Sequence, residues 1–352
     1  MKQLRNNVIR AGLDALYFTG AHHVLRPILS GVGTIFMLHH VRPARDDMFQ
    51  PNRHLEITPD FLREVLAHVR ALSVDLVSMD EAHRRMRERD FARRFACFTF
   101  DDGYRDNRDH ALPVMREHNA PFTVYVASDF AEGIGRLWWV ALERVIARAG
   151  TIEIMRDGAV ERLDAGEPAA KQQAFSQIHD WLRTLPNDTD VQRAVGDLCA
   201  RHGVDDASIA RELCMSWAEL RSFANDPLVT IGAHTISHCN LARDSEADAA
   251  REMRVSRERI EAELQKPALH FAYPYGDRTA AAAREFAMAR ELGFATAVTT
   301  RPGMIFTENT EHLTALPRIS LNGNYQTTRF LSVLTSGAAT AMWNGFRRVD
   351  AA

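Results

Sequence analysis

Residues 94–103, RFACFTFDDG, decide how the fold of this chain is interpreted. An apolar run is followed at once by two adjacent carboxylates and a glycine, which is the pattern of a buried strand that ends at a polar site. Successive side chains of a strand point to opposite faces, but a turn directly after the strand can bring both carboxylates to one cavity. Gly103 permits such a turn. We therefore expect Asp101 and Asp102 to share one site at the end of this strand.

Six further apolar runs have the same character, and helical patterns separate them. These runs are 33–40, 75–79, 121–128, 228–234, 268–274 and 294–300. Strands that alternate with helices predict a mainly parallel sheet, either open or closed into a barrel. In both architectures the active site lies at the carboxyl ends of the strands. Several of the runs end in residues that suit such a site: His39, His40, His234, Tyr275 and Gly276.

The composition is that of an ordinary globular protein, because the 352-residue chain is 46% hydrophobic and 25% charged. Its net charge is −3, so no global basic field predicts a nucleic-acid partner. Four scattered cysteines without a CxxC pair predict reduced thiols. No signal peptide or spanning run is recognisable. We therefore expect a cytoplasmic protein, with peripheral contact at the inner membrane face as an alternative.

Residues 131–215 interrupt the alternation of strands and helices. This segment is mostly polar and helical in pattern, without clear strands, and we interpret it as a helical insertion or cap. The terminal segments 1–32 and 326–352 are mildly amphipathic. They predict helices at both ends of a main body that spans 33–325.

The stretch HTISH at 234–238 contains two histidines four positions apart, and one helical turn would place both imidazoles on the same face. This spacing is common, and two partly exposed histidines without a ligand are the simpler interpretation of it alone. With one of the two aspartates added, two imidazoles and a carboxylate form a ligand set that suits a zinc-like cation with open positions. The cation would relieve the repulsion between the adjacent aspartates. The other aspartate would then be free to act as a base toward a water molecule.

Three stretches resemble the motifs of the polysaccharide deacetylases, also called the NodB-homology family or carbohydrate esterase family four. They are TFDDG at 99–103, HTISH at 234–238 and YPYGD at 273–277. The resemblance covers about 33–130 and 216–325. It implies an α/β fold, a distorted (β/α)7 barrel, that removes N-acetyl or sometimes O-acetyl groups from sugars. A chitooligosaccharide, a polysaccharide or a lipid-linked sugar would fit as substrate.

The resemblance also implies roles for individual residues. Asp101 would be the general base, and Asp102, His234 and His238 would hold a divalent metal. Zinc is the default metal, with cobalt, nickel, manganese and iron as alternatives. The backbone N–H of Tyr275 would stabilise the oxyanion. Aromatic side chains near the motifs could stack on a sugar ring, and we name Tyr104, Tyr273 and Trp139 as candidates.

Two departures from the family pattern leave questions open. Ala272 stands where the family usually has an arginine that holds the base, so Arg278 or Arg318 could take over that task. The usual late motif that supplies the general acid is missing. The stretch IFMLHHV at 35–41 resembles the opening strand of a circularly permuted branch of the family, in which the acid histidine comes first. By that alignment His39, rather than His40, is the general acid.

Other classes of protein use similar residues. Non-haem iron oxygenases also have two histidines and a carboxylate, but on a β-sandwich-like barrel rather than a βα alternation. Glycosidases need two carboxylates, but adjacent aspartates poorly suit the roughly 5–9 Å separation across a glycosidic bond. A carbohydrate-binding protein with a decayed site is the non-enzymatic alternative, although all four expected site residues are present.

Overall fold

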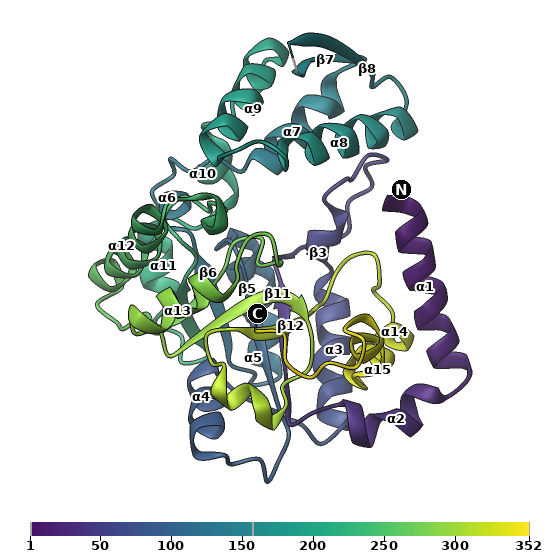
Figure 1. Ribbon diagram of the computed structural model, residues 1–352, viewed down its shortest axis with the longest axis vertical. Helices are drawn as coiled ribbons and strands as arrows, with labels where there is room; N and C mark the ends of the chain where they lie inside the picture. The colour runs from purple at the N-terminus through teal and green to yellow at the C-terminus, as the bar shows by residue number, and fades with distance from the viewer. Residues whose placement is uncertain (1, 157, 352) are drawn as a thin grey trace.

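The computed structural model describes residues 2–156 and 158–351 (Figure 1). Three residues lie outside this description: 1 and 352, which are the outer limits of the predicted terminal segments, and 157, which belongs to the predicted insertion. Within the described part, seven parallel strands close into a ring in the order β1-β12-β11-β10-β9-β6-β5, and β5 pairs with β1. The strands are β1 Gly33–Leu38, β5 Phe95–Phe100, β6 Phe122–Val126, β9 Val229–Ala233, β10 His270–Ala272, β11 Thr296–Pro302 and β12 Leu316–Ser320. The prediction of a (β/α)7 barrel is confirmed.

One strand of the ring is not among the runs identified in the sequence. β12 has the sequence LPRIS, in which a proline and an arginine conceal the strand pattern. Arg318 nevertheless lies fully buried in the barrel because a carboxylate pairs with it there. The run at 75–79 contributes only β4, Asp75–Leu76, which pairs with Phe95 and Ala96 at the start of β5 and is not part of the ring.

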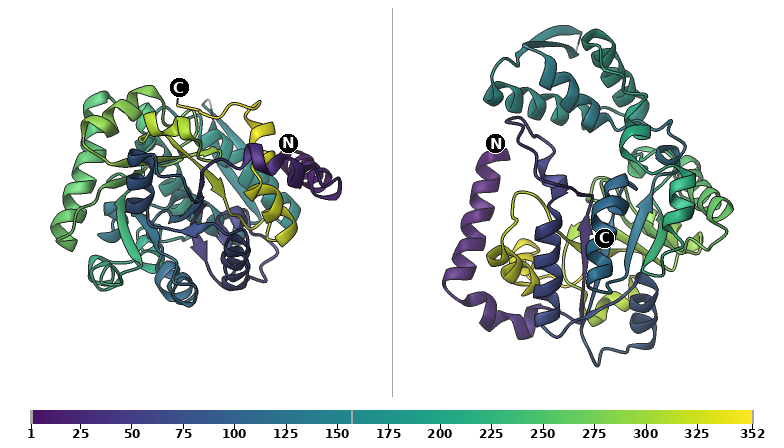
Figure 2. Two further views of the ribbon diagram at one scale, coloured as in Figure 1. Left: turned by 90° about the horizontal axis from the view of Figure 1, so that it is seen from below. Right: turned by 180° about the vertical axis from the view of Figure 1, so that it is seen from behind.

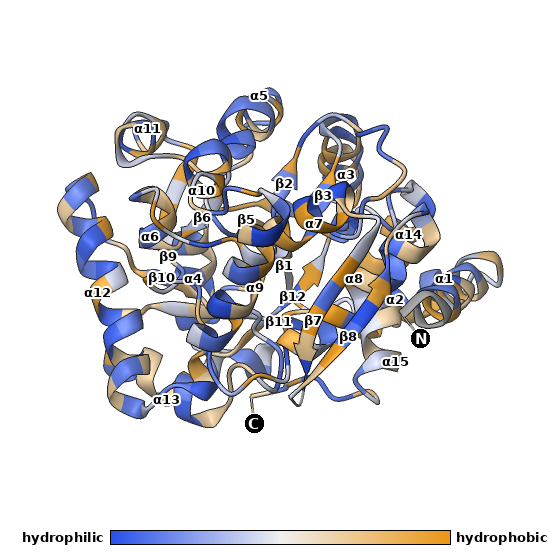
Figure 3. Ribbon diagram, turned by 90° about the horizontal axis from the view of Figure 1, so that it is seen from above, coloured by the Kyte–Doolittle hydropathy of each residue, from blue (hydrophilic) through white to orange (hydrophobic). Residues whose placement is uncertain are grey.

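Helices cover the outside of the ring with their apolar faces, as the view from above shows (Figure 3). In α3, Pro59–Ala71, the Thr58 side chain accepts a hydrogen bond from the N–H of Phe61 and so caps the helix. Proline suits the first turn, where its missing N–H is not needed. The main apolar core lies between helices and strands, and a smaller cluster fills the ring. The other covering helices are α5 Leu112–Glu117, α11 Trp217–Phe223, α12 Glu246–Leu264 and α13 Ala283–Glu291, whereas α4 Met79–Glu88 packs its buried residues into the cluster that fills the ring.

The segment between β6 and β9 differs from the expected insertion without strands. It contains an antiparallel hairpin, β7 Thr151–Arg156 with β8 Ala159–Asp164. The hairpin forms because Ile152 and Ile154 alternate with polar residues and pack into an apolar core, and because Gly158 adopts a φ of 78°. The helices of this segment are α6 Ser128–Ala131, α7 Trp138–Arg148, α8 Pro168–Leu182, α9 Asp188–His202 and α10 Ile209–Leu213. Most of it lies above the carboxyl ends of the strands (Figure 1).

The two ends of the chain form helices that pack on each other beside the barrel (Figure 2). α1 contacts α14, and α2 contacts α15. Their bounds are α1 Lys2–Phe18, α2 Ala21–Leu29, α14 Thr328–Thr335 and α15 Ala338–Trp343. None of the helices in the described part of the chain is both long and apolar enough to cross a membrane.

Candidate active site

The two adjacent aspartates lie at the carboxyl end of β5. The N–H of Asp101 donates to the Leu38 carbonyl of β1 and so continues the strand pairing. Asp102 and Gly103 then adopt φ values of 73° and 67°, which turn the chain sharply. Both aspartates are only 2% exposed. The turn thus places two carboxylates in one buried region, where each needs partners to offset the loss of water.

Asp102 faces two histidines. Its Oδ1 lies 3.3 Å from Nε2 of His238 and 3.5 Å from Nε2 of His234. Nδ1 of His234 donates to the Ala272 carbonyl at 2.7 Å, so Nε2 keeps its lone pair toward Asp102. Within the described residues, Oδ1 of Asp102 is buried without a hydrogen-bond donor. A buried carboxylate oxygen that faces imidazole nitrogens fits a bound cation, and these three residues form a candidate metal site.

The segment that carries both histidines is a loop, so the expectation of one helical turn is wrong. Thr235 and His238 have φ values of 65° and 62°, which are unusual for residues other than glycine and strained for a β-branched one. Glu252 of α12 fixes the loop, because its Oε2 accepts hydrogen bonds from the N–H groups of Ile236 and Ser237 at 2.8 and 3.0 Å. The sequence-based reasoning missed Glu252, since nothing near the motif identifies a carboxylate on the next helix as its support.

Asp101 is held by Arg318, one of the two arginines proposed for this task. Arg318 donates from Nη1 to Oδ1 at 2.8 Å and from Nη2 to Oδ2 at 2.7 Å, and its Nε donates to the Thr299 carbonyl. Burial raises the pKa of Asp101, but the charge and hydrogen bonds of Arg318 more than offset this, and the pKa falls below its ordinary value. Arg278 instead forms an ion pair at the surface.

His39 and His40 have different surroundings. Nε2 of His39 lies 3.9 Å from Oδ2 of Asp101, within the site. Burial lowers the pKa of His39, and the nearby carboxylates offset this only in part. His40 is part of the short strand β2, His40–Val41; its Nδ1 lies 2.6 Å from Oδ2 of Asp106, and its ring stacks on Tyr104. The structure therefore places His39, rather than His40, beside the expected base.

Two of the three aromatic residues expected to contact sugar are inaccessible. Tyr104 is fully buried under Trp139, whose Nε1 donates to its hydroxyl at 3.3 Å. Tyr273 is fully buried in the main core and donates its hydroxyl hydrogen to the Thr314 carbonyl. The prediction that these two tyrosines bind substrate is wrong, because neither ring face can meet a sugar. Trp139 packs beside the metal-site residue His238, with ring centroids 4.9 Å apart.

Tyr275 lies between the barrel and the insertion. Its backbone has a φ of 61°, and within the described residues its N–H donates to no acceptor. The hydroxyl accepts a hydrogen bond from Nε1 of Trp138, and the guanidinium of Arg183 lies 4.5 Å from the ring centroid. The insertion thus contacts the same residue whose N–H is available to a ligand.

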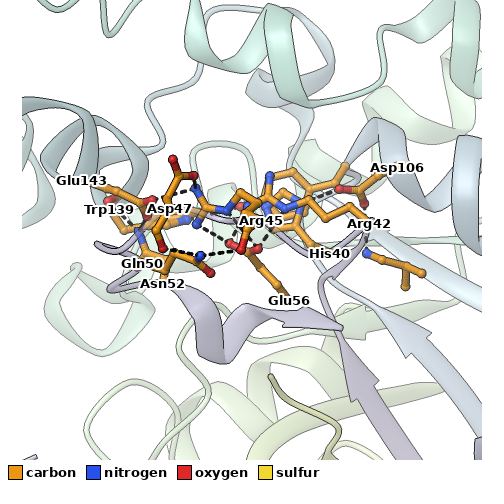
Figure 4. A network of polar contacts seen from close by, with 12 residues as sticks. His40, Arg42, Arg45, Asp47, Gln50, Asn52, Glu56, Asp106, Trp139 and Glu143 are labelled. Carbon is orange, nitrogen blue, oxygen red and sulfur yellow. Dashed lines mark hydrogen bonds and ion pairs between the residues drawn. The ribbon is translucent and has the colours of Figure 1, made fainter. Parts of the chain in front are cut away.

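A polar network holds the insertion to the loop between β2 and β3, Glu56–Ile57 (Figure 4). Arg45 in this loop binds Glu56 and reaches Glu143 of α7 at 3.0 Å. Asn52 donates to the Trp139 carbonyl and to Glu143. Because Trp139 covers His238, this network fixes part of the wall around the candidate metal site.

A parallel barrel with a candidate carboxylate–imidazole ligand set and a second, paired carboxylate at its carboxyl end fits the arrangement of residues in metal-dependent hydrolases. The family model for polysaccharide deacetylase matches residues 88–157 and 191–297, just over half of the chain. The chain therefore belongs to the polysaccharide deacetylase family. It is a hydrolase of carbon–nitrogen bonds that acts on an acetylated carbohydrate, and the candidate metal site agrees with the usual metal dependence of the family.

Solved structures of deacetylases share the fold. The Streptococcus pyogenes deacetylase PplD, in complex with acetate, aligns with a TM-score of 0.55 at 17% identity over 86% of this chain and 97% of that chain. IcaB from Ammonifex degensii gives 0.52 at 16% identity over 87% and 96%. The de-N-acetylase from Aggregatibacter actinomycetemcomitans gives 0.52 at 10% identity over 86% and 99%. No curated protein matches this chain.

Proposed function

We propose that this protein removes N-acetyl groups from the amino sugars of a carbohydrate in a metal-dependent hydrolysis. The observation that carries the proposal is the convergence of Asp102, His234 and His238 beside Asp101, a second carboxylate that takes no part in the ligand set. A divalent cation held by the three residues would polarise the acetyl carbonyl and acidify the attacking water.

Zinc suits the distances from Asp102 to the two histidines, and cobalt, nickel, manganese and iron are the alternatives. Tetrahedral zinc with bonds of about 2.0–2.1 Å holds neighbouring ligand atoms about 3.3 Å apart. Oδ1 of Asp102 lies 3.3 and 3.5 Å from the two Nε2 atoms. A set of two nitrogens and one oxygen also disfavours calcium and magnesium, which prefer oxygen ligands.

The residues around the ligand set supply the proton transfers. Asp101, oriented by Arg318, would take a proton from the water that attacks the acetyl carbon. The N–H of Tyr275 would donate to the oxyanion on that carbon, a contribution of about 3–4 kcal/mol in comparable sites. The proton that Asp101 takes would pass to Nε2 of His39, which would then protonate the amide nitrogen while the carbon–nitrogen bond breaks. The 3.9 Å between His39 and Asp101 lets both groups reach one substrate amide, and the products are acetate and a free amine.

Acetate release from a panel of acetylated sugars tests this function. Wild-type protein should release acetate, and a chelator should stop the release. Asp101→Asn should lower the rate by at least about 10²-fold, the usual contribution of a general base, while it retains the metal. Asp60→Asn, at an exposed aspartate on α3, is the matched control and should behave as wild type. Equal rates for Asp101→Asn and wild type would refute the base assignment. A protein that binds metal and sugar but releases no acetate would be the non-catalytic alternative.

A further inference from the structure

The insertion covers one flank of the site, whereas the flank beside β1 is more open. Trp138 and Trp139 pack against Tyr275 and His238. The side chain of His39 is 18% exposed, compared with 3% for Asp101 in the same pair. His39 directly follows β1, and β12 is the neighbour of β1 in the ring. The greater exposure of His39 therefore favours an approach of the substrate from the side of β1.

A cavity of about 300 Å³ lies next to the segments that follow these two strands. Its walls come from α1, from the short helix η1 Arg53–Leu55, and from the loop after β12. The loop is fixed in place, because the side-chain oxygen of Gln326 accepts a hydrogen bond from the N–H of Thr58 at 2.9 Å. Gly323 packs so closely that a Cβ there would lie 2.2 Å from the Arg53 carbonyl oxygen. The cavity is therefore built into the fold.

Most of the side chains that line the cavity are cationic or amide-bearing, and Tyr325 and Thr327 complete the polar lining. The cationic and amide-bearing residues include Asn6, Asn7, Arg10, Arg53, Asn324 and Gln326, and the lining within the described residues contains no aspartate or glutamate. Among the described residues neither arginine forms an ion pair, whereas Arg45 nearby binds two glutamates. Guanidinium groups bind phosphate oxygens with paired hydrogen bonds, and amide N–H groups add further donors. Two exposed cations with no carboxylate beside them in the described lining favour an anionic ligand over a neutral sugar.

We infer that this cavity binds a phosphate group carried by the substrate, so that the protein acts on an amino sugar linked to phosphate. The part that concerns the sugar rests on the proposed deacetylation, but phosphate binding itself does not. The phosphate could belong to a soluble sugar phosphate or to a lipid-linked sugar, and its chemistry at the cavity is the same. The exposed apolar side chains Val8 on α1 and Val24 and Ile28 on α2 would suit the lipid-linked form.

Titration calorimetry with inorganic pyrophosphate on the full chain tests the cavity directly. The double variant Arg10→Gln/Arg53→Gln should bind pyrophosphate at least tenfold more weakly than wild type. Arg290→Gln is the matched control, because this exposed arginine on α13 also has no ion pair among the described residues. Both arginines of the cavity are exposed, so thermal unfolding should verify that the double variant folds as wild type. Equal pyrophosphate affinity in all three proteins, or no binding by wild type, would overturn the inference.

Acetate release then connects the cavity to the substrate. The kcat/KM of wild type should be higher for N-acetylglucosamine 1-phosphate than for N-acetylglucosamine, and the ratio should fall about tenfold in the double variant but not in Arg290→Gln. A polyprenyl-linked form of the same sugar phosphate separates the sources: a further preference for it identifies the lipid-linked substrate, and its absence identifies the soluble one. An unchanged ratio in the double variant would count against the inference. If no sugar releases acetate while pyrophosphate binding still depends on the two arginines, the proposed function fails and the phosphate site stands.

Discussion

Removal of the guanidinium that holds Asp101 should reduce both stability and activity. Arg318 is fully buried, and Asp101 is only 2% exposed. Arg318→Met therefore leaves a buried carboxylate without its cation, which typically costs about 3–5 kcal/mol. The variant also leaves the Thr299 carbonyl without the N–H of Nε, a loss of about 1 kcal/mol. A total of this size is a large part of the roughly 5–15 kcal/mol that stabilises most domains.

A double-mutant cycle separates this pair from general damage to the core. Urea unfolding would be measured for Arg318→Met, Asp101→Asn and the combined variant. The combined variant removes both charges, so it should lose about 1–3 kcal/mol less than the sum of the two single variants. Additivity within about 0.5 kcal/mol would refute the view that the two side chains act as one unit. If Arg318→Met fails to fold, Arg318→Lys keeps the charge, loses the paired geometry, and completes the cycle.

Three further predictions concern metal, pH and packing. Glu252→Gln should loosen the loop that carries His234 and His238 and so weaken metal binding by about 10–100-fold. Competition with a chromogenic chelator measures this affinity, and an unchanged value would contradict the supporting role of Glu252. Burial raises the pKa of Glu56, but hydrogen bonds and attraction from Arg42 and Arg45 lower it overall below its ordinary value of 4.5. The ionised Glu56 therefore stabilises the fold above that pH, and this stabilisation is lost as the pH falls further. Between about pH 5 and 3 the unfolding free energy of Glu56→Gln should drop less than that of wild type. An equal drop in both proteins would argue against the ion pairs. Tyr273→Phe should cost about 1–3 kcal/mol in urea unfolding and leave the KM unchanged, whereas a raised KM would restore its assignment to substrate binding.

Periodicity in the sequence predicts six of the seven ring strands and misses β12, which holds a proline and an arginine within five residues. β12 escapes detection because LPRIS contains Arg318, and an arginine inside a strand normally argues against burial. The residue is buried because Asp101, more than two hundred positions away, neutralises it. Only the closed ring brings these two side chains together. The strand was therefore hidden from the sequence, which could name Arg318 only as one of two candidates for holding the base.

Local spacing predicts which residues belong to the candidate site but not how they are held there. His234 and His238 reach Asp102 as expected, yet they do so from a loop with positive φ values rather than from a helix. The separation of four positions is compatible with both conformations. The loop is stabilised by Glu252 on a separate helix, and such a long-range support has no local signature.

For the aromatic residues, too, the sequence motif predicts which residues lie near the site but not which way their side chains point. Tyr273 and Tyr275 belong to one short motif and look equivalent in the sequence. Residues two apart in a strand would face the same way, but the chain leaves β10 after Ala272, and Tyr275 adopts a φ of 61°. Tyr273 therefore turns into the core, whereas Tyr275 reaches the insertion. A single turn of the backbone separates a structural tyrosine from one at the candidate site.

The two adjacent aspartates have different partners and suit different chemical roles, although they are neighbours in the chain. Placed side by side in a uniform buried environment, two carboxylates would share a proton, because both could not remain ionised. Here the positive φ of Asp102 directs the two groups to different partners. Asp101 forms an ion pair with Arg318, whereas Asp102 faces two imidazoles with which it forms the candidate metal site. Burial raises the pKa of each, and these separate partners lower both again below the ordinary value. The pair can thus stay doubly ionised, one member suited to bind metal and the other suited to accept a proton.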